Sequence, residues 1–346
     1  MRSTLVAHCR AGFEAETAAD LRRIAARAGA AIDLELGQAY VIGGVPAADW
    51  HSALASEPPI FARSMFVGAG PFALIQDAQG RADRVTPILS AIDRIARPPW
   101  RSVWVEFPDT NEGKQLSGLA RALATRIEAS LRDRRALRDS APMRLHVFLT
   151  DGATAYIGES TARGNDWPMG IARLRMPPGA PSRSTLKLAE AFDVFLGERQ
   201  HEALRPGMRA IDLGAAPGGW TWQLAQRGIA VTAVDNGPLK GAIRDDRLVT
   251  HVRDDAFRFR PKRPVDWLVC DVVEQPIRIA ELVARWIADG NARRAIFNLK
   301  LPMKKRYDEV RRCTQRIDEM VRAPHTLAMR QLYHDREEVT GFVERA

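Results

Sequence analysis

The sequence predicts an α/β protein, with a doubly wound parallel sheet in its second half and a smaller α+β region in its first. From Ser184 onward, apolar runs of strand length alternate with helical patterns, which is typical of a parallel sheet. One of these runs ends in Asp212 and a glycine-rich turn, and such sheets bind ligands at the carboxyl ends of their strands. A length of 346 residues is enough for two or three domains.

The first half contains strands and helices in mixed order, which favours a sheet with helices on one face. We divide it into an N-terminal α+β (ferredoxin-like) subdomain, 1–60, and a second part, 61–163. In 1–60 we expect a helix at 14–28 and strands at 4–8, 31–35 and 39–43. In 61–163 we expect strands at 64–67, 103–107 and 145–150, and helices at 85–95 and 116–131. Residues 164–183 are rich in proline and glycine and predict a linker or an ordered loop.

Residues 184–346 are expected to form one domain. Its predicted helices span 184–196, 219–227, 276–288 and 304–321, with a further short helix after 234. Its predicted strands span 209–213, 229–234, 247–252, 266–270, 294–299, 327–333 and 339–343. The last two strands predict an antiparallel hairpin that closes the sheet.

The glycine-rich turn has the spacing Gly214-x-x-x-Gly218-Gly219. Glycines let the backbone approach a ligand closely. Asp235 ends the next strand, about twenty residues on, where a carboxylate accepts hydrogen bonds from ribose hydroxyls. The spacing matches neither the G-x-G-x-x-G dinucleotide fingerprint nor a P-loop. The pattern therefore favours the nucleoside site of an S-adenosylmethionine (SAM) methyltransferase; a tight turn without a ligand is the alternative.

The chain has a net charge of +9, and its basic residues recur along the whole length. This distribution favours a polyanion as partner, although a basic surface kept for solubility is the alternative. The sequence has no apolar run of membrane-spanning length and no signal peptide, so we expect a cytoplasmic protein without a membrane partner. The three cysteines form no C-x-x-C pair, so we expect neither a disulfide framework nor a metal site.

Four charged residues lie where chemistry is expected. Asp271 and Lys300 directly follow predicted strands. Lys187 lies in the first turn of helix 184–196, off its apolar stripe, where a cation opposes the helix dipole. Glu338 begins the last region of strand. Each alone fits a solvated charge, but two lysines and two carboxylates around one nucleoside site favour a catalytic group.

Six segments of the second half resemble a single family. They are residues 181–188, 212–220, 234–238, 269–274, 297–305 and 332–339. The family is the bacterial 23S ribosomal RNA 2′-O-ribose methyltransferase RlmM, which modifies a cytidine in domain V. The first half matches more diffusely, at 61–66 and 167–170, and the resemblance implies a THUMP-type RNA-binding domain there. Ala216 departs from the family, which often has cysteine at that position.

The resemblance implies a Rossmann-like SAM-dependent methyltransferase domain with 23S rRNA as its partner, and we expect a monomer. It implies Lys300 as the acceptor of the 2′-hydroxyl proton. Because an ordinary lysine is protonated near neutral pH, we expect burial and the charge of Lys187 to lower the pKa of Lys300. Asp271 is expected to orient Lys300, and Glu338 to hold Lys187. The division of labour among these four residues stays open.

The resemblance also implies a set of SAM contacts. They are Ser184, Ala216, Pro217, Gly218, Gly219, Asp235, Asp255 and Asp271. Within this set, Asp235 is expected to bind the ribose hydroxyls and Asp255 the adenine amino group. Ser184 is expected near the methionine end.

Competing functions are less well supported. Base N-methyltransferases usually have [DNS]-P-P-[YFW] after the fourth strand, and the sequence at Asp271 lacks it. Cytosine C5 methylation needs a nucleophilic cysteine, and Cys270 lies in an apolar strand that favours an inert core thiol. The non-enzymatic alternative is an RNA-binding ribosome assembly factor with a vestigial SAM pocket.

Overall fold

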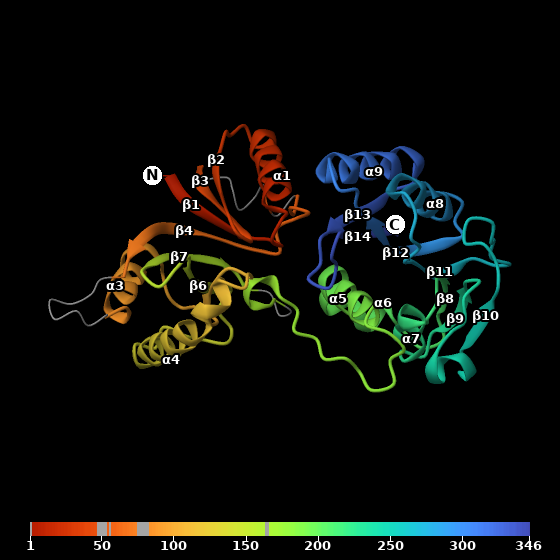
Figure 1. Cartoon of the computed structure of the whole chain (residues 1–346), viewed down its shortest axis with the longest axis horizontal. Coiled ribbons are helices and arrows are strands. Elements are labelled where there is room, and N and C mark those ends of the chain that lie inside the picture. The colour runs from red at the N-terminus through yellow and green to blue at the C-terminus, as the bar shows by residue number, and fades with distance from the viewer. Residues whose placement is uncertain (1, 47–53, 55–56, 75–82, 163–165) are drawn as a thin grey trace. The chain divides into compact units, whose positions relative to one another are not determined.

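The computed structural model describes residues 2–46, 54, 57–74, 83–162 and 166–346. The chain forms two compact units, Met1–Ile171 and Ala172–Ala346 (Figure 1). Among the described residues, each unit contains one seven-stranded sheet. The boundary between the units falls inside the proline- and glycine-rich segment 164–183.

The sheet of the first unit has the strand order β2-β3-β1-β4-β7-β6-β5. Only β5 and β6 pair in parallel, and the other neighbours pair antiparallel. Because β1 pairs with β4, a single sheet joins strands from both sides of residue 60. The strands are β1 Arg2–His8, β2 Asp33–Gly37, β3 Tyr40–Pro46, β4 Ser64–Ala73, β5 Val103–Glu106, β6 Met143–Leu149 and β7 Thr154–Thr161.

Helices cover one face of this sheet, as the sequence predicts. Helix α1 (Glu14–Arg27) packs on Leu5 of β1, and helices α3 (Val85–Ile95) and α4 (Ser117–Asp133) pack on Leu145 of β6. Leu5 pairs with Val67, Val67 with Glu159, and Glu159 with Leu145 across neighbouring strands. Because directly paired residues point to the same face of a sheet, Leu5 and Leu145 share a face, and so do the three helices that pack on them. Two short 3-10 helices, η1 (Gly113–Leu116) and η2 (Pro168–Gly170), complete the unit.

The sheet of the second unit has the order β10-β9-β8-β11-β12-β14-β13. The first five strands are parallel, and β14 pairs antiparallel with both β12 and β13. The predicted parallel sheet with a closing hairpin is therefore confirmed. The strands are β8 Arg209–Leu213, β9 Ala230–Val234, β10 Val249–Val252, β11 Val265–Cys270, β12 Ala292–Lys300, β13 His325–Arg330 and β14 Glu338–Arg345.

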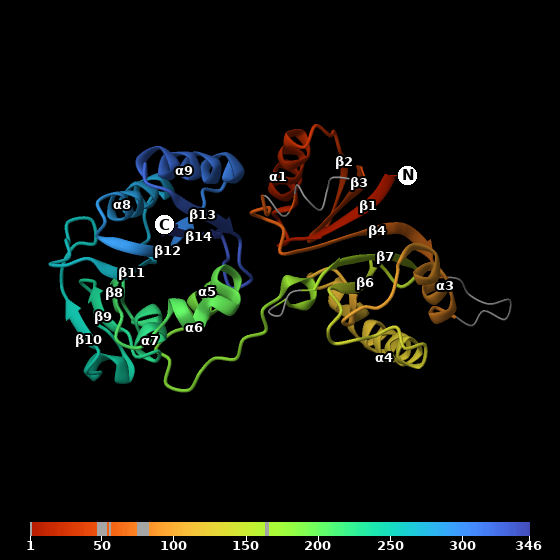
Figure 2. The ribbon, with the colours of Figure 1, turned by 180° about the vertical axis from the view of Figure 1, so that it is seen from behind.

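Helices cover both faces of the second sheet, with α5 and α7 on one side and α8 and α9 on the other (Figures 1 and 2). The helical segments are α5 Thr185–Leu196, η3 Gly197–Arg199, α6 Gln200–Ala203, α7 Gly219–Ala225, η4 Gly241–Asp245, α8 Pro276–Ala288 and α9 Arg306–Met320. Val269, Ile296 and Phe342 pack in the core under α5 and α7. Since side chains alternate along a strand, Asp271 and Lys300 lie on that same face.

Among the described residues, no helix has the length and hydropathy needed to cross a bilayer.

Candidate active site

The glycine-rich turn joins β8 to α7 through backbone conformations that favour glycine. Gly214 has φ +77° and Gly218 has φ +112°. A Cβ atom on Gly219 would lie 2.3 Å from Oγ of Ser184, so the start of α5 packs directly against the turn. Two of the predicted cofactor-binding segments, at Ser184 and at the turn, are therefore adjacent.

Asp235, which follows β9, holds the glycine-rich turn through backbone hydrogen bonds. Its Oδ2 accepts a hydrogen bond from the Ala216 backbone N–H at 3.0 Å, and its Oδ1 accepts one from Gly237 N–H at 2.7 Å. A carboxylate oxygen has capacity for more than one hydrogen bond. Asp235 can therefore hold the turn and still accept hydroxyl groups of a ligand, as a nucleoside site requires.

Asp212 is buried beneath this turn, and sequence reasoning noted it only as a strand end. Its Oδ2 accepts a 2.6 Å hydrogen bond from Thr221, while its Oδ1 has no hydrogen-bond partner among the described residues. Burial raises the pKa of Asp212 to about 7; the Thr221 bond lowers it, and the negative charge of Asp271 raises it further. An orphaned buried acceptor at the turn fits a ligand that brings positive charge or hydrogen-bond donors, and SAM carries both.

Asp255 follows β10 at the same edge of the sheet as Asp235. Its Oδ1 accepts a hydrogen bond from Phe257 N–H at 2.7 Å, which fixes the loop after the strand. Asp255 is exposed, so its carboxylate is accessible to a ligand at this edge.

The four residues predicted to carry chemistry form one continuous chain of alternating charge. Lys300 Nζ lies 2.6 Å from Asp271 Oδ1 and 2.9 Å from Glu338 Oε1. Glu338 Oε2 in turn forms an ion pair with Lys187 of α5. The register of β12 and β14 places Lys300 directly opposite Glu338. Their side chains are 15–22% exposed, so a substrate can reach them from solvent.

The electrostatics of Lys300 correct one prediction. Burial alone would lower the pKa of Lys300, but the carboxylates of Asp271 and Glu338 outweigh burial and raise it above its ordinary value. The expected lowering of the Lys300 pKa is therefore wrong. Asp271 makes the larger contribution, and Glu338 adds to it because it contacts Lys300 as well as Lys187 and so offsets the charge that was expected to repel the Lys300 proton.

Glu338 shows the converse effect. Burial would raise the pKa of its carboxyl, but the charges of Lys300 and Lys187 lower it below its ordinary value. Glu338 is therefore ionised at neutral pH, between two lysines.

Asn298 and Thr340 belong to the same group, and sequence reasoning missed both. Asn298 Nδ2 donates to Asp271 Oδ1 at 3.0 Å and to Glu338 Oε2 at 3.2 Å. Thr340 Oγ1 donates to Asn298 Oδ1 at 2.8 Å. The sequence does contain a feature that indicates Asn298: it is a polar residue within an otherwise apolar run. Because it lies two residues before Lys300, its side chain is on the same face of the strand.

Cys270 does not join this group. It is fully buried, and burial raises the pKa of its thiol to about 12. A thiol with that pKa does not supply the thiolate that cytosine C5 methylation requires.

Within the described part of the chain, no group of three or more His, Cys, Asp or Glu side chains is placed to hold a metal ion.

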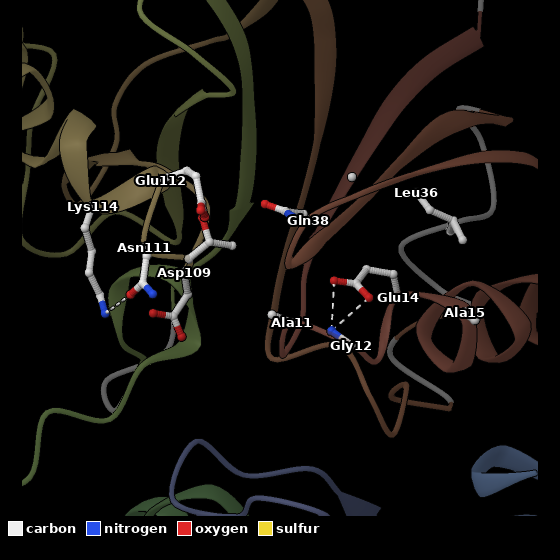
Figure 3. Close-up of a pocket in the computed structure, with 12 residues that line it drawn as sticks. Ala11, Gly12, Glu14, Ala15, Leu36, Gln38, Asp109, Asn111, Glu112 and Lys114 are labelled. Carbon is white, nitrogen blue, oxygen red and sulfur yellow. Dashed lines mark hydrogen bonds between the residues drawn. The ribbon is translucent and has the colours of Figure 1, made fainter. Parts of the chain in front are cut away.

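A separate hollow of about 760 Å³ lies in the first unit (Figure 3). Its walls come from the start of α1, the β2–β3 turn and the segment 109–114. Glu14, Asp109 and Glu112 line it together with Lys114, so its charge disfavours a phosphate ligand. The Glu14 carboxylate already accepts the Gly12 and Ala39 N–H groups. None of the predicted site residues line this hollow.

We expect Asp235→Ala to raise the dissociation constant of SAM by about 10- to 100-fold, the size expected for lost hydrogen bonds to a charged group. The variant removes the predicted acceptor of the ribose hydroxyls and the bonds that hold Ala216 and Gly237. Isothermal titration measures the change. The matched control is Asp289→Ala, an exposed aspartate that follows α8 at the opposite edge of the sheet. Unchanged SAM affinity in Asp235→Ala would remove Asp235 from the cofactor site.

Comparison with known proteins gives a consistent result. A family model described as FtsJ-like methyltransferase matches residues 180–306, and one described as ribosomal RNA large subunit methyltransferase M, N-terminal, matches residues 83–161. A protein of the latter name from Methylococcus capsulatus is 48% identical over 352 residues, covering 99% of this chain and 98% of its own. The protein of that name from Laribacter hongkongensis is 54% identical over 278 residues, covering 79% and 78%.

Proposed function

Because the chain belongs to the ribosomal RNA large subunit methyltransferase M family, we propose that it methylates the ribose 2′-oxygen of a cytidine in domain V of 23S rRNA. The observation that carries this proposal is the contact chain Lys187–Glu338–Lys300–Asp271. A ribose hydroxyl is a poor nucleophile and must lose its proton as it attacks. A partly exposed lysine held by two carboxylates beside the glycine-rich turn supports the proposal, with Lys300 as the acceptor once its own proton has left.

Each residue of the chain has a distinct role in this proposal. Lys300 Nζ, in its neutral form, accepts the 2′-hydroxyl proton. Asp271 and Glu338 hold Lys300 in place and stabilise the ammonium that forms. Lys187, fixed by Glu338, supplies positive charge near the developing alkoxide. SAM, the cofactor of this methyltransferase family, supplies the methyl group from a positively charged sulfur.

We also propose roles for the residues around the glycine-rich turn and the neighbouring strand ends in binding SAM. We assign Asp235 to the ribose hydroxyls, Asp255 to the adenine amino group, and Asp212 to the positively charged end of the methionine part. The remaining contacts to the methionine part and the methyl group are assigned to Ser184, Ala216, Pro217, Gly218, Gly219 and Asp271.

RNA binding is assigned to the first unit as a THUMP-type function. The match of residues 83–161 to the N-terminal model of the family supports this assignment. The exposed side chains of α4 include Arg121 and Arg126, which can contact phosphates, although residues 1–171 carry 20 basic and 19 acidic residues and most of the excess positive charge lies in residues 172–346. Such contacts neutralise phosphates and make affinity depend on salt.

The pKa of Lys300 leads to a pH prediction. The reactive form is the neutral amine, and Asp271 and Glu338 raise the pKa of Lys300, so the neutral fraction is small at neutral pH and grows with pH. We expect the single-turnover rate constant to rise about tenfold per unit between about pH 6.5 and pH 8.5, without a plateau. The measurement uses saturating SAM and RNA. A plateau below about pH 8 would show that Lys300 is not the titrating acceptor described here.

Methylation mapping tests the proposed function in cells. The 23S rRNA of cells lacking this protein should lose one domain V ribose methylation, and the wild-type gene should restore it. A Lys300→Ala gene should produce stable protein without restoring the mark. An intact methylation pattern in the cells that lack the protein would refute the proposal. Restoration of the methyl group by the Lys300→Ala gene would refute the catalytic role of Lys300 and favour the alternative of an RNA-binding assembly factor.

A further inference from the structure

The carboxylates that hold Lys300 are themselves held by a buried amide. Asn298 is fully buried and lies two residues before Lys300 on β12, directly opposite Thr340 on β14. Its Nδ2 group has two hydrogens. One is donated to Asp271 Oδ1 and the other to Glu338 Oε2. Asn298 and Lys300 thus bridge the same two carboxylates.

This contact also fixes the orientation of the Asn298 amide. If the amide were flipped, its oxygen would face two carboxylates, and acceptors would face acceptors. The Nδ2 group therefore faces Asp271 and Glu338, and Oδ1 faces Thr340. Oδ1 cannot donate, so the single hydroxyl proton of Thr340 goes to Asn298.

Asp335 completes the sequence of hydrogen bonds. Its Oδ2 lies 2.9 Å from Thr340 Oγ1, and both side chains are buried. Thr340 Oγ1 therefore contacts both Asn298 Oδ1 and Asp335 Oδ2 and links these two buried side chains. Burial raises the pKa of Asp335 well above its ordinary value, and the negative charge of Glu338 raises it further.

The loop that carries Asp335 is anchored to the helix that carries Lys187. Glu190 of α5 accepts hydrogen bonds from Tyr333 N–H at 2.7 Å and from His334 N–H at 2.9 Å. Asp335 Oδ2 also accepts from Leu332 N–H at 3.0 Å. Hydrogen bonds therefore hold the loop that carries Asp335 against α5, the helix that carries Lys187.

We propose that Asp335, Thr340 and Asn298 are positioning residues that act through Asp271 and Glu338 to aim Lys300 at the 2′-hydroxyl. The Thr340 hydroxyl links the Asp335 carboxyl to the Asn298 amide, and the Asn298 amide donates to both carboxylates. Without this support the two carboxylates turn toward solvent, and Lys300 loses its fixed direction. The inference rests on the proposed 2′-O-methyl transfer.

The test compares Thr340→Val with Thr340→Ser. Valine keeps the volume of threonine but removes the hydroxyl, whereas serine keeps the hydroxyl. We expect Thr340→Val to lower the single-turnover rate constant about tenfold, the size expected for the loss of one buried hydrogen bond. RNA KM should be unchanged, and SAM affinity should change much less than the rate because Asp271 is one of several assigned SAM contacts. Thr340→Ser should retain the wild-type rate. A normal rate in Thr340→Val, or equal losses in both variants, would overturn the proposal.

A second variant covers a failure to fold. If Thr340→Val does not bind SAM, Asn298→Ala decides the question, because it removes the amide donors without adding charge. A lowered rate with intact SAM binding supports the proposal, and a full rate overturns it. The wild-type product is identified in the same assay. A wild-type product that is not 2′-O-methylated defeats the proposed function, whereas a 2′-O-methylated product with an unaffected Thr340→Val rate defeats only this inference.

Discussion

Replacing Lys300 by alanine is expected to lower the single-turnover rate of methyl transfer by about 10²- to 10⁴-fold, the usual contribution of a general base. SAM affinity should change far less than the rate, because Lys300 is not among the residues assigned to SAM and only one of its two partners, Asp271, is. Rapid-quench transfer of labelled methyl groups to 23S rRNA measures the rate. Isothermal titration measures SAM affinity in the same preparations.

Lys300→Arg separates proton transfer from positive charge. An arginine can still pair with Asp271 and Glu338, but its guanidinium stays protonated and cannot accept a proton. We therefore expect Lys300→Arg to be as inactive as Lys300→Ala. The matched control is Lys262→Ala. Lys262 is exposed and precedes β11, at the end of that strand opposite to Asp271, so this variant should be fully active. Substantial activity in Lys300→Arg would contradict the role of Lys300 as general base.

Removal of the first unit is expected to separate RNA binding from cofactor binding. The fragment 172–346 contains the complete second sheet and its own apolar core. It should bind SAM with the affinity of the full chain but methylate 23S rRNA at least about 100-fold more slowly, because the phosphate contacts of the first unit are lost. Filter binding measures the contribution of the first unit to RNA affinity: the fragment should bind 23S rRNA more weakly than the full chain. Its remaining affinity should still depend on salt, because 31 of the 51 basic residues lie in 172–346.

The outcome is informative in either direction. A fragment with full methylation activity would contradict the assignment of RNA binding to the first unit. A fragment that fails to bind SAM would show that the second unit needs the first for its fold.

The general location of the site could be predicted from the sequence, because parallel strands bring their carboxyl ends to one edge. Asp235 and Asp271 directly follow apolar strands and Lys300 is the last residue of β12, so their convergence follows from the strand order. The strand–turn–helix geometry at Gly218 was equally predictable, since a glycine tolerates its left-handed backbone.

Other features depend on contacts that a single sequence does not contain. The pairing of Lys300 with Glu338 depends on the antiparallel register of β12 and β14, and the sequence places Glu338 only near a strand start. The carboxylate of Asp271, together with that of Glu338 across this register, raises the pKa of Lys300 instead of the predicted lowering. Strand β7 was also missed, because its sequence is polar and contains glycine, and its pairing with β6 and β4 makes it a strand.

The most direct test of the account is the chemical identity of the product. Purified protein, SAM and unmodified 23S rRNA are incubated, and the RNA is then cleaved with alkali. A methyl group on the 2′-oxygen blocks cleavage at the modified nucleotide, whereas a methyl group on the base does not. The account predicts one alkali-resistant cytidine in domain V, which is absent when the protein carries Lys300→Ala. A methylated but alkali-sensitive nucleotide would contradict ribose methylation and, with it, the role assigned to Lys300.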